Sequence, residues 1–217
     1  MLEAAGYSAQ STGEPVCCGL TWISTGQLEG ARRQLRRSLQ ALEPAVRAGT
    51  PIVGLEPSCT AVLRGEIAEL LPADPRARQV RAATRTLAEL LAGTEKWAPP
   101  DLAGVRAVAQ PHCHHHAVMG WHTDSALLAS AGAEVTAVGG CCGLAGNFGV
   151  ERGHYDVSRA VAETALLPAV RAAREGDGAA VVLADGFSCR TQLDQLAGVS
   201  GTHLAQLLAS RLADPPA

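Results

Sequence analysis

The sequence lacks any long apolar stretch. No run approaches the roughly 18–20 apolar residues that cross a membrane, because Arg, Asp or Glu interrupts each one. The N-terminus has no basic segment followed by an apolar one, so it does not resemble a secretory signal peptide. We therefore expect a cytoplasmic protein with no membrane span, with a composition that is compatible with peripheral membrane association.

The chain also lacks the features of a nucleic-acid-binding protein. Its net charge is −3 and only 3% of its residues are aromatic, so neither a basic balance nor a base-stacking platform is present. Four arginines form a local cluster at helical spacing, which predicts a solvated helix face. They are Arg32, Arg33, Arg36 and Arg37. We expect no nucleic-acid partner.

The apolar content is sufficient for a folded core. Of the 217 residues, 47% are hydrophobic and 18% are charged, which excludes a disordered chain. The length fits one domain or two small ones.

Without a secretion signal, a disulfide framework is not expected, yet the chain has seven cysteines. No Cys-x-x-Cys pair occurs among them. The cysteines are clustered at Cys17–Cys18, Cys59, Cys113, Cys141–Cys142 and Cys189. In a cytosolic protein, such clustering indicates metal or redox chemistry.

The sequence repeats itself with an offset of about 124–130 residues. Cys17-Cys18-Gly19-Leu20 returns as Cys141-Cys142-Gly143-Leu144, and Ser58-Cys59 matches Ser188-Cys189. Pro44-Ala45-Val46-Arg47-Ala48 returns unchanged as Pro168-Ala169-Val170-Arg171-Ala172, and Leu2-Glu3-Ala4-Ala5-Gly6 resembles Leu128-Ala129-Ser130-Ala131-Gly132. We infer two copies of one unit, residues 1–98 and 101–217, joined at Pro99-Pro100.

The two copies differ at their starts. The second copy begins with an apolar run before Cys113, whereas Met1 already lies inside the equivalent of the helix that follows. We therefore expect the first copy to be truncated at its N-terminus, without its first strand and the ligand after it.

Strands and helices alternate in both copies, which predicts an α/β fold of two repeated parallel-sheet βαβ units. In the second copy we expect strands at Gly104–Ala109, Glu134–Val138 and Ala179–Ala184, and helices at Ala117–Ser130, Asp156–Ala173 and from about Thr191 and Thr202. In the first copy we expect a strand at Pro51–Leu55 and helices at Gln27–Arg47, Ala61–Leu70 and Arg78–Leu91.

Each cysteine of the second copy follows the end of an expected strand. Cys113 follows Ala109, Cys141 and Cys142 follow Val138, and Cys189 follows Ala184. The carboxyl ends of parallel strands share one edge of the sheet, where open α/β folds build their sites. Four thiols that are far apart in the sequence are thus expected to converge.

Several interpretations of the cysteines compete. A buried, purely structural cysteine is one, and a disulfide or thiol relay is another, although adjacent cysteines make a strained ring. A zinc site would accept cysteine and histidine, but its usual closely spaced ligand pairs are missing. An iron–sulfur cluster takes thiolates around a wider core, and Gly143, Gly146 and Gly149 would let backbone amides approach the sulfurs.

Nearby polar residues have structural and functional interpretations. His114, with His115 and His116, is expected either to donate to a cluster sulfur or carry a proton, or to cap the following helix. Glu56 and Asp185 are expected to form turns.

These residues resemble the cysteine-rich CCG domain. The resemblance is carried by five segments and covers nearly the whole chain. They are Cys17 to Trp22, Gly54 to Cys59, His112 to His114, Cys141 to His154 and Ala184 to Arg190. Paired CCG domains occur in heterodisulfide reductase, in the subunit designated B, and in the glycolate oxidase iron–sulfur subunit. The nearest resemblance is to the C-terminal iron–sulfur region of FAD-linked D-lactate and D-2-hydroxyglutarate dehydrogenases.

The resemblance implies an iron–sulfur electron-transfer module that passes electrons from flavin to an acceptor. It implies that Cys113, Cys141, Cys142 and Cys189 ligate one cluster, and that Cys17, Cys18 and Cys59 form the remnant of a second site. Neither copy ends in Cys-x-x-Cys, unlike heterodisulfide reductase. An ordinary 4Fe–4S cluster is thus expected rather than a noncubane one.

Neither a Gly-rich flavin-binding region nor a ferredoxin-like run of cysteines is visible. We expect both domains, with FAD, to reside on a partner, and we assign no catalytic residue here. The chain would then act as part of an oxidoreductase of CH–OH groups and would not oxidise a hydroxy acid alone. The alternatives are a zinc-binding or partner-docking module and a thiol-disulfide reductase resembling heterodisulfide reductase.

Overall fold

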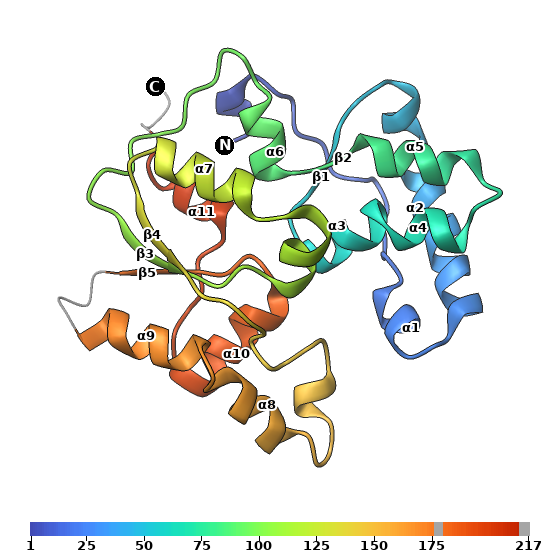
Figure 1. Ribbon diagram of the computed structural model, residues 1–217. Coiled ribbons are helices and arrows are strands. Elements are labelled where there is room, and N and C mark those ends of the chain that lie inside the picture. The colour runs from blue at the N-terminus through green and yellow to red at the C-terminus, as the bar shows by residue number, and fades with distance from the viewer. Residues whose placement is uncertain (176–179, 213–217) are drawn as a thin grey trace.

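The computed structural model describes residues 1–175 and 180–212. It is an α/β protein with two small parallel sheets, as the sequence predicts. Helices cover both faces of the larger sheet: α7 and α11 lie on one side, and α8, α9 and α10 on the other (Figure 1).

The larger sheet belongs to the second half of the chain. Its strands are β3 (Arg106–Ala109), β4 (Glu134–Ala137) and β5 (Val181–Leu183), in the order β4-β3-β5. All pairs are parallel, and Ala109 aligns with Ala137 and with Leu183. The three predicted strands are therefore confirmed, except that Ala179 of the third lies outside the described residues.

The predicted helix Ala117–Ser130 is wrong in its first turns. A π-helical turn spans His115–Met119, and α7 begins only at His122 and ends at Ser130. Between them Gly120 has φ 73° and ψ 151°. That combination of angles is incompatible with a helix, so the chain must break there.

The predicted helix Asp156–Ala173 is two helices, α8 (Tyr155–Ala162) and α9 (Leu166–Glu175). The Thr164 hydroxyl donates to the carbonyl of Val161 at 2.7 Å, which competes with the helical pattern. Pro168 follows in the first turn of α9, where proline is tolerated because no helical N–H is required.

The last two helices begin away from their predicted starts. Helix α10 (Phe187–Ala197) starts four residues before Thr191, so Cys189 lies in its first turn rather than in a loop. Helix α11 (Leu204–Ala209) starts after His203, whose ring and Gln206 form a capping box.

The first half consists mainly of helices around a two-stranded parallel sheet. Strand β1 (Ile52–Gly54) pairs with β2 (Thr84–Thr86). The helices are α1 (Leu20–Ser24), α2 (Leu28–Arg47), α3 (Pro57–Arg64), α4 (Glu66–Leu70), α5 (Pro75–Ala83) and α6 (Leu87–Ala92). Helix α2 and strand β1 are where the sequence predicts them.

Two predicted helices of the first half are interrupted. The helix Ala61–Leu70 divides at Gly65, which has φ −126° and ψ −89° and separates α3 from α4. The helix Arg78–Leu91 is replaced by α5, β2 and α6. The Thr84 hydroxyl bonds back to the carbonyl of Val80 at 2.7 Å, and Thr86 starts α6 through a capping box with Glu89.

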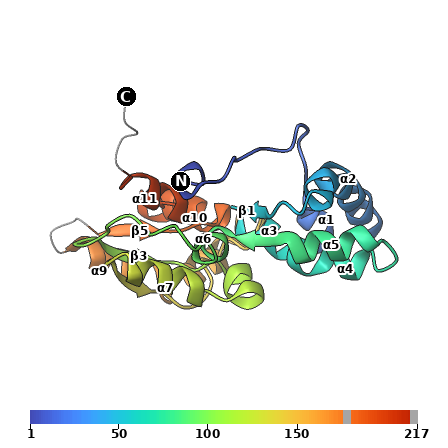
Figure 2. The ribbon, with the colours of Figure 1, turned by 90° about the horizontal axis from the view of Figure 1, so that it is seen from above.

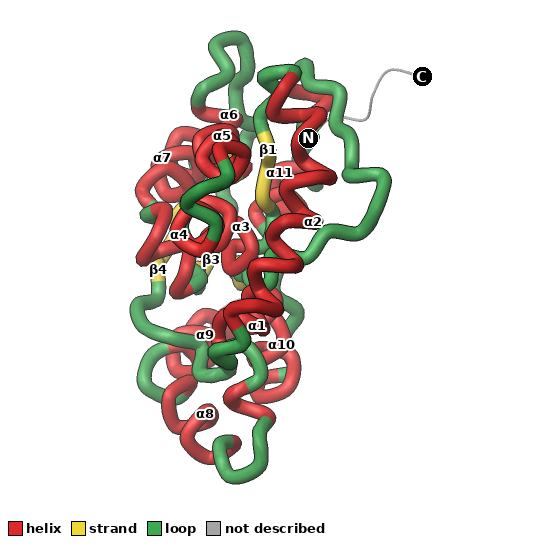
Figure 3. The backbone as a smooth tube through the Cα atoms, turned by 90° about the vertical axis from the view of Figure 1, so that its right-hand side faces the viewer, coloured by secondary structure: helices red, strands yellow, loops and turns green. Residues whose placement is uncertain are grey.

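One local contact occurs at equivalent positions of the two predicted copies. The amide of Tyr7 bonds to the carbonyl of Leu2, and that of Ala133 to Leu128, after left-handed glycines at equivalent positions. However, the helix expected around Met1 is only the short 3-10 turn Glu3–Ala5. Residues 6–19 then run along the outside of the molecule from this turn, beside α11, to α1 (Figures 2 and 3).

The two halves share a hydrophobic core. Leu87, Ala88 and Leu91 of α6 pack in one buried cluster with side chains of α7 and α11, including Leu128 and Leu208. A second cluster lies among α2, α4 and α5, at one end of the molecule (Figure 2). A third surrounds Cys142 and Cys189 beneath α9 and α10.

Arg33, Arg36 and Arg37 lie on the exposed face of α2, and Arg32 is partly buried, which agrees with the predicted solvated face. Within the described ranges, none of the helices has the length and apolarity that a bilayer crossing needs.

Candidate metal centre

The strand order of the larger sheet is the one that the predicted convergence of the cysteines requires. Cys113 follows central strand β3, Cys141 and Cys142 follow β4, and Cys189 follows β5. Since these strands are parallel neighbours, the four residues leave the same edge of the sheet. All seven cysteines lie in the described part of the chain, and all are free thiols.

The four thiols of the second half form a row of neighbours. Cys141 interacts with Cys113 on one side and with Cys142 on the other, and Cys142 also interacts with Cys189. In the described residues, no three of the four sulfurs lie within 4.8 Å of one another. The sulfurs are thus close in pairs, but they do not converge on a single point.

These interactions make the pKa values of the thiols differ from one another. The Cys113 and Cys142 thiols donate to Cys141, and these hydrogen bonds hold the pKa of Cys141 far below its usual value. The same interactions and burial raise the pKa of Cys113 and of Cys142. The site therefore favours a thiolate at Cys141, and a thiolate is the form that binds a metal.

Gly143 is fixed in place behind the paired cysteines. Its N–H donates to Cys141 Sγ at 3.3 Å, and its φ is +93°. A Cβ atom there would lie 2.2 Å from the carbonyl oxygen of Ser158. Ser158 is held in turn by the buried amide of Gln192, which donates to its hydroxyl at 2.9 Å. Only glycine fits this position.

The histidines after β3 fall into different environments. His112 is buried against Gly186, where an added Cβ would lie 2.1 Å from the ring, and burial lowers the pKa of His112. His114 is partly buried, and its Nδ1 has no hydrogen-bond partner among the described residues. His115 is buried and contacts Asp124. The sequence pattern gives no separate role to His112 or Asp124.

The other predicted cofactor residue, Gly146, differs from Gly143. Its φ is +72°, but a Cβ atom would meet nothing within 4 Å. In the described residues its amide makes no hydrogen bond to a cysteine sulfur. Its role at the site stays a prediction.

The first half brings together two of its three cysteines. Cys18 Sγ and Cys59 Sγ lie 3.1 Å apart, and their hydrogen bond lowers the pKa of Cys18 to about 7 and raises that of Cys59. Cys17 is exposed and accepts the N–H of Gly19 at 3.4 Å. This contact repeats the one between Gly143 and Cys141.

Glu56 connects the two halves beside both groups of cysteines. Its Oε1 accepts the Ser58 hydroxyl at 2.6 Å and caps α3, and its Oε2 accepts the N–H of Phe187 at 2.8 Å. Its charge acts on Cys18 and Cys59 as well as on His112. The sequence predicts a turn at Glu56 but not this link, which joins residues 131 positions apart.

The predicted turn residue Asp185 instead caps a helix, because its carboxylate accepts the N–H of Leu204 at 2.7 Å. Trp97 and Trp121 pack against the shared core.

The donor set fits an iron–sulfur cluster. Four free thiols from three separate segments of the chain, with a backbone N–H directed at one sulfur, are the groups that such clusters use.

No family model matches the chain. One relative is the subunit designated C of the anaerobic glycerol-3-phosphate dehydrogenase of Escherichia coli strain K12. The two sequences are 30% identical over 219 residues, which cover 98% of this chain and 54% of that subunit. The chain is 28% identical to a D-2-hydroxyglutarate dehydrogenase of Pseudomonas putida over 76% of this chain and 16% of that protein. The corresponding figures for the Escherichia coli K12 D-2-hydroxyglutarate dehydrogenase are 26%, 84% and 18%.

The chain therefore spans about half the length of the curated glycerol-3-phosphate dehydrogenase relatives it matches, and less of the longer enzymes. These relatives are all named as dehydrogenases or as parts of them, and they fit the family of iron–sulfur proteins that contain CCG domains.

Proposed function

We propose that this chain is an iron–sulfur electron-transfer module of a flavin-linked dehydrogenase. The convergence of four free thiols at the carboxyl edge of one parallel sheet carries the proposal. Cys113, Cys141, Cys142 and Cys189 hold a 4Fe–4S cluster. Cys17, Cys18 and Cys59 form a second, incomplete site.

The spacing of the sulfurs supports a cluster rather than a single zinc ion. Four sulfurs at about 2.3 Å from one zinc lie less than about 4.6 Å apart. Among the described residues, no three sulfurs of the second half lie within 4.8 Å of one another. A wider inorganic core suits this arrangement better.

When bound, a 4Fe–4S cluster accepts and releases one electron at a time. The surrounding residues prepare its site. The Gly143 N–H donates to Cys141 Sγ and stabilises negative charge on this sulfur. The unpartnered Nδ1 of His114 is available to a cluster sulfur or to a proton.

The names of the relatives support the choice of partner. They denote dehydrogenases of glycerol 3-phosphate and D-2-hydroxyglutarate, whose oxidised group in each case is a CH–OH. We infer that a flavin-containing domain or separate chain oxidises such an alcohol, with a D-2-hydroxy acid as the expected class. A ferredoxin-like domain completes the route to the acceptor. Free thiols suit a reducing compartment, so we place the complex in the cytoplasm.

Reversible reduction tests this function. The anaerobically purified chain is expected to be brown, to bleach with dithionite and to recover its absorbance with a mild oxidant. The same cycle in Cys189→Ser should be lost, whereas Cys17→Ser, which alters only the first site, should retain it. A coloured protein that cannot be reduced would contradict electron transfer. A colourless protein that contains zinc would favour the structural module.

A further inference from the structure

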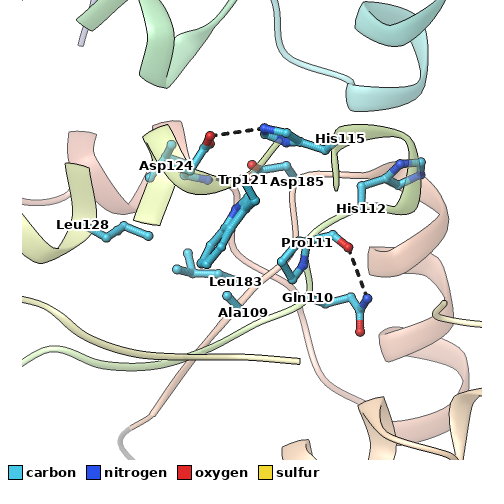
Figure 4. Close-up of a pocket in the computed structure, with 11 residues that line it drawn as sticks. Ala109, Gln110, Pro111, His112, His115, Trp121, Asp124, Leu128, Leu183 and Asp185 are labelled. Atoms are coloured by element: carbon cyan, nitrogen blue, oxygen red, sulfur yellow. Dashed lines mark hydrogen bonds and ion pairs between the residues drawn. The ribbon is translucent and has the colours of Figure 1, made fainter. Parts of the chain in front are cut away.

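A second group of metal-ligating side chains contains no cysteine. His115, Asp124 and Asp185 each offer one ligand atom, and the three atoms lie within 4.8 Å of one another. His115 comes from the π-helical turn after β3, Asp124 from the first turn of α7, and Asp185 from the loop between β5 and α10. Figure 4 shows the three side chains pointing toward a common point.

The group is enclosed by protein. The side chains of His115 and Asp124 are 5% and 4% exposed, and that of Asp185 is 15% exposed. Two cavities of about 10 Å³ are both lined by these three residues. Each has room for about one water molecule or ion. The second cavity is also lined by Leu55 and Thr86, so it lies where the two halves meet.

The carboxylates keep unused coordination capacity. Asp124 Oδ2 contacts His115 Nε2 at 3.1 Å, and Asp185 Oδ1 accepts the N–H of Leu204 at 2.7 Å. The other oxygen of each carboxylate has no hydrogen bond to any residue that the structure describes. Both oxygens are therefore open positions for a ligand.

Neighbouring residues supply at most one positive charge for the two carboxylates. A protonated His115 can offset one carboxylate at most. His203 Nδ1 lies 3.7 Å from Asp185 Oδ1, but it accepts the N–H of Ala205 while Nε2 donates to the carbonyl of Leu55. The Nδ1 atom of His203 therefore offers no proton to Asp185.

The remaining charged neighbour is Glu89, which adds negative potential at His115 and is already paired with Arg64 at 2.7 Å. Unpaired charge of this kind is costly inside a protein.

We propose that His115, Asp124 and Asp185 form a binding site for a divalent cation of the first transition row. One imidazole and two carboxylates suit ions such as Mn²⁺, Fe²⁺ and Zn²⁺. The cation neutralises the two carboxylates. It also ties together α7, the turn that follows Cys113 and the loop that leads to Cys189. It is distinct from the cysteine centre, because its ligands are nitrogen and oxygen.

The test uses Mn²⁺ as its probe, because Mn²⁺ prefers oxygen and nitrogen ligands to thiolates and the cysteines compete little for it. Free Mn²⁺ is followed by electron paramagnetic resonance during titration of the anaerobically purified, metal-depleted chain. We expect one bound Mn²⁺ per chain and a higher melting temperature. Asp124→Asn and Asp185→Asn should lose both effects. Asp156→Asn, which removes an exposed carboxylate on α8, should keep them.

Loss of binding must be separated from loss of folding. Asparagine has nearly the shape of aspartate and at position 185 still accepts the Leu204 N–H, so the metal-free variants should melt no lower than the natural protein. His115→Gln is a third ligand variant, to be used if either asparagine variant fails to fold.

The proposal is wrong if the natural chain takes up no Mn²⁺, or if the ligand variants bind it equally well. Asparagine variants that melt higher, together with no Mn²⁺ uptake by the natural chain, would show that the carboxyls share a proton instead. Mn²⁺ uptake does not depend on iron, so this outcome is separate from that of the electron-transfer test.

Discussion

Gly143 and Gly146 both have left-handed backbone conformations, but only Gly143 is enclosed. The Ser158 carbonyl lies where the first side-chain atom at Gly143 would be, whereas the space beside Gly146 is open. The difference arises because α8 and α10 meet behind the Cys141-Cys142 pair, where Gln192 holds Ser158. The glycine that donates to a cysteine sulfur is therefore also the one that the packing requires.

Gly143→Ala should destabilise the chain by about 3 kcal/mol, the sum of overpacking and left-handed strain. Gly146→Ala is the matched control and should cost only about 1 kcal/mol, from backbone conformation alone. The measurement is denaturant unfolding of both variants and the natural protein. Equal costs at the two positions would contradict the packing that we describe.

At the scale of elements, the ends of the helices are set by a few side chains. Asp74 caps α5 by accepting the Arg76 N–H at 3.0 Å, and it also pairs with the Arg76 guanidinium at 2.8 Å. The hydrogen bond and charge of Arg76 lower the pKa of Asp74. The ionised carboxylate thus stabilises the folded state above the pKa that Asp74 has when unfolded. That contribution is lost as the pH falls through the lower, folded value.

Asp74→Ala should cost about 1 kcal/mol near neutral pH, the usual value of an N-cap, and the cost should shrink in acid. Asp74→Asn keeps an acceptor for the cap but loses the charge. It should be less destabilising than Asp74→Ala and should remove the part of the pH dependence of stability that Asp74 contributes. Chemical denaturation between pH 3 and 7 measures the stability of both variants. A cost of Asp74→Ala that grows in acid would contradict the predicted direction of the pH dependence.

The sequence predicts the long, regular elements and the positions of the cysteines relative to them. Helix α2 and the three strands of the larger sheet follow from periodicity, and the shared edge of parallel strands then predicts which thiols meet. Strand β2 was missed because three residues, Thr84-Arg85-Thr86, leave no pattern and are stabilised only by pairing with β1. The breaks at Gly65, Gly120 and Thr164 depend on single backbone angles or side-chain hydrogen bonds.

The sequence could not predict the contacts that join distant segments. The bond from the Phe187 N–H to Glu56 and the meeting of His115, Asp124 and Asp185 depend on how the two halves pack. No local pattern marks Asp124 among the other acidic residues. A weak signal was present at Asp185 and Glu56, which each precede the last cysteine of a repeat.

At the scale of the whole molecule, the shared core couples the two halves of the chain. Helix α6 precedes the Pro99-Pro100 linker in the chain, yet its buried leucines pack with residues of the second half. The helices α2, α4 and α5 form a separate cluster at the far end (Figure 2). A perturbation in α6 should therefore destabilise the second half as well as the first.

Leu91→Ala should destabilise the chain by about 2–5 kcal/mol, because Leu91 is almost fully buried in the shared core. Leu28→Ala, at an exposed position in α2, should cost less than about 0.5 kcal/mol. Thermal unfolding read by circular dichroism compares the variants. A Leu91→Ala transition that affects only part of the signal would show that the halves unfold independently.

The central claim is that Cys113, Cys141, Cys142 and Cys189 hold one cluster, and metal analysis tests it most directly. Iron, acid-labile sulfide and zinc are to be measured in the anaerobically purified chain and in Cys142→Ser and Cys17→Ser. We predict about four irons with matching sulfide in the natural chain, loss of both in Cys142→Ser, and their retention in Cys17→Ser. Zinc without sulfide, or iron and sulfide that persist in Cys142→Ser, would contradict the claim.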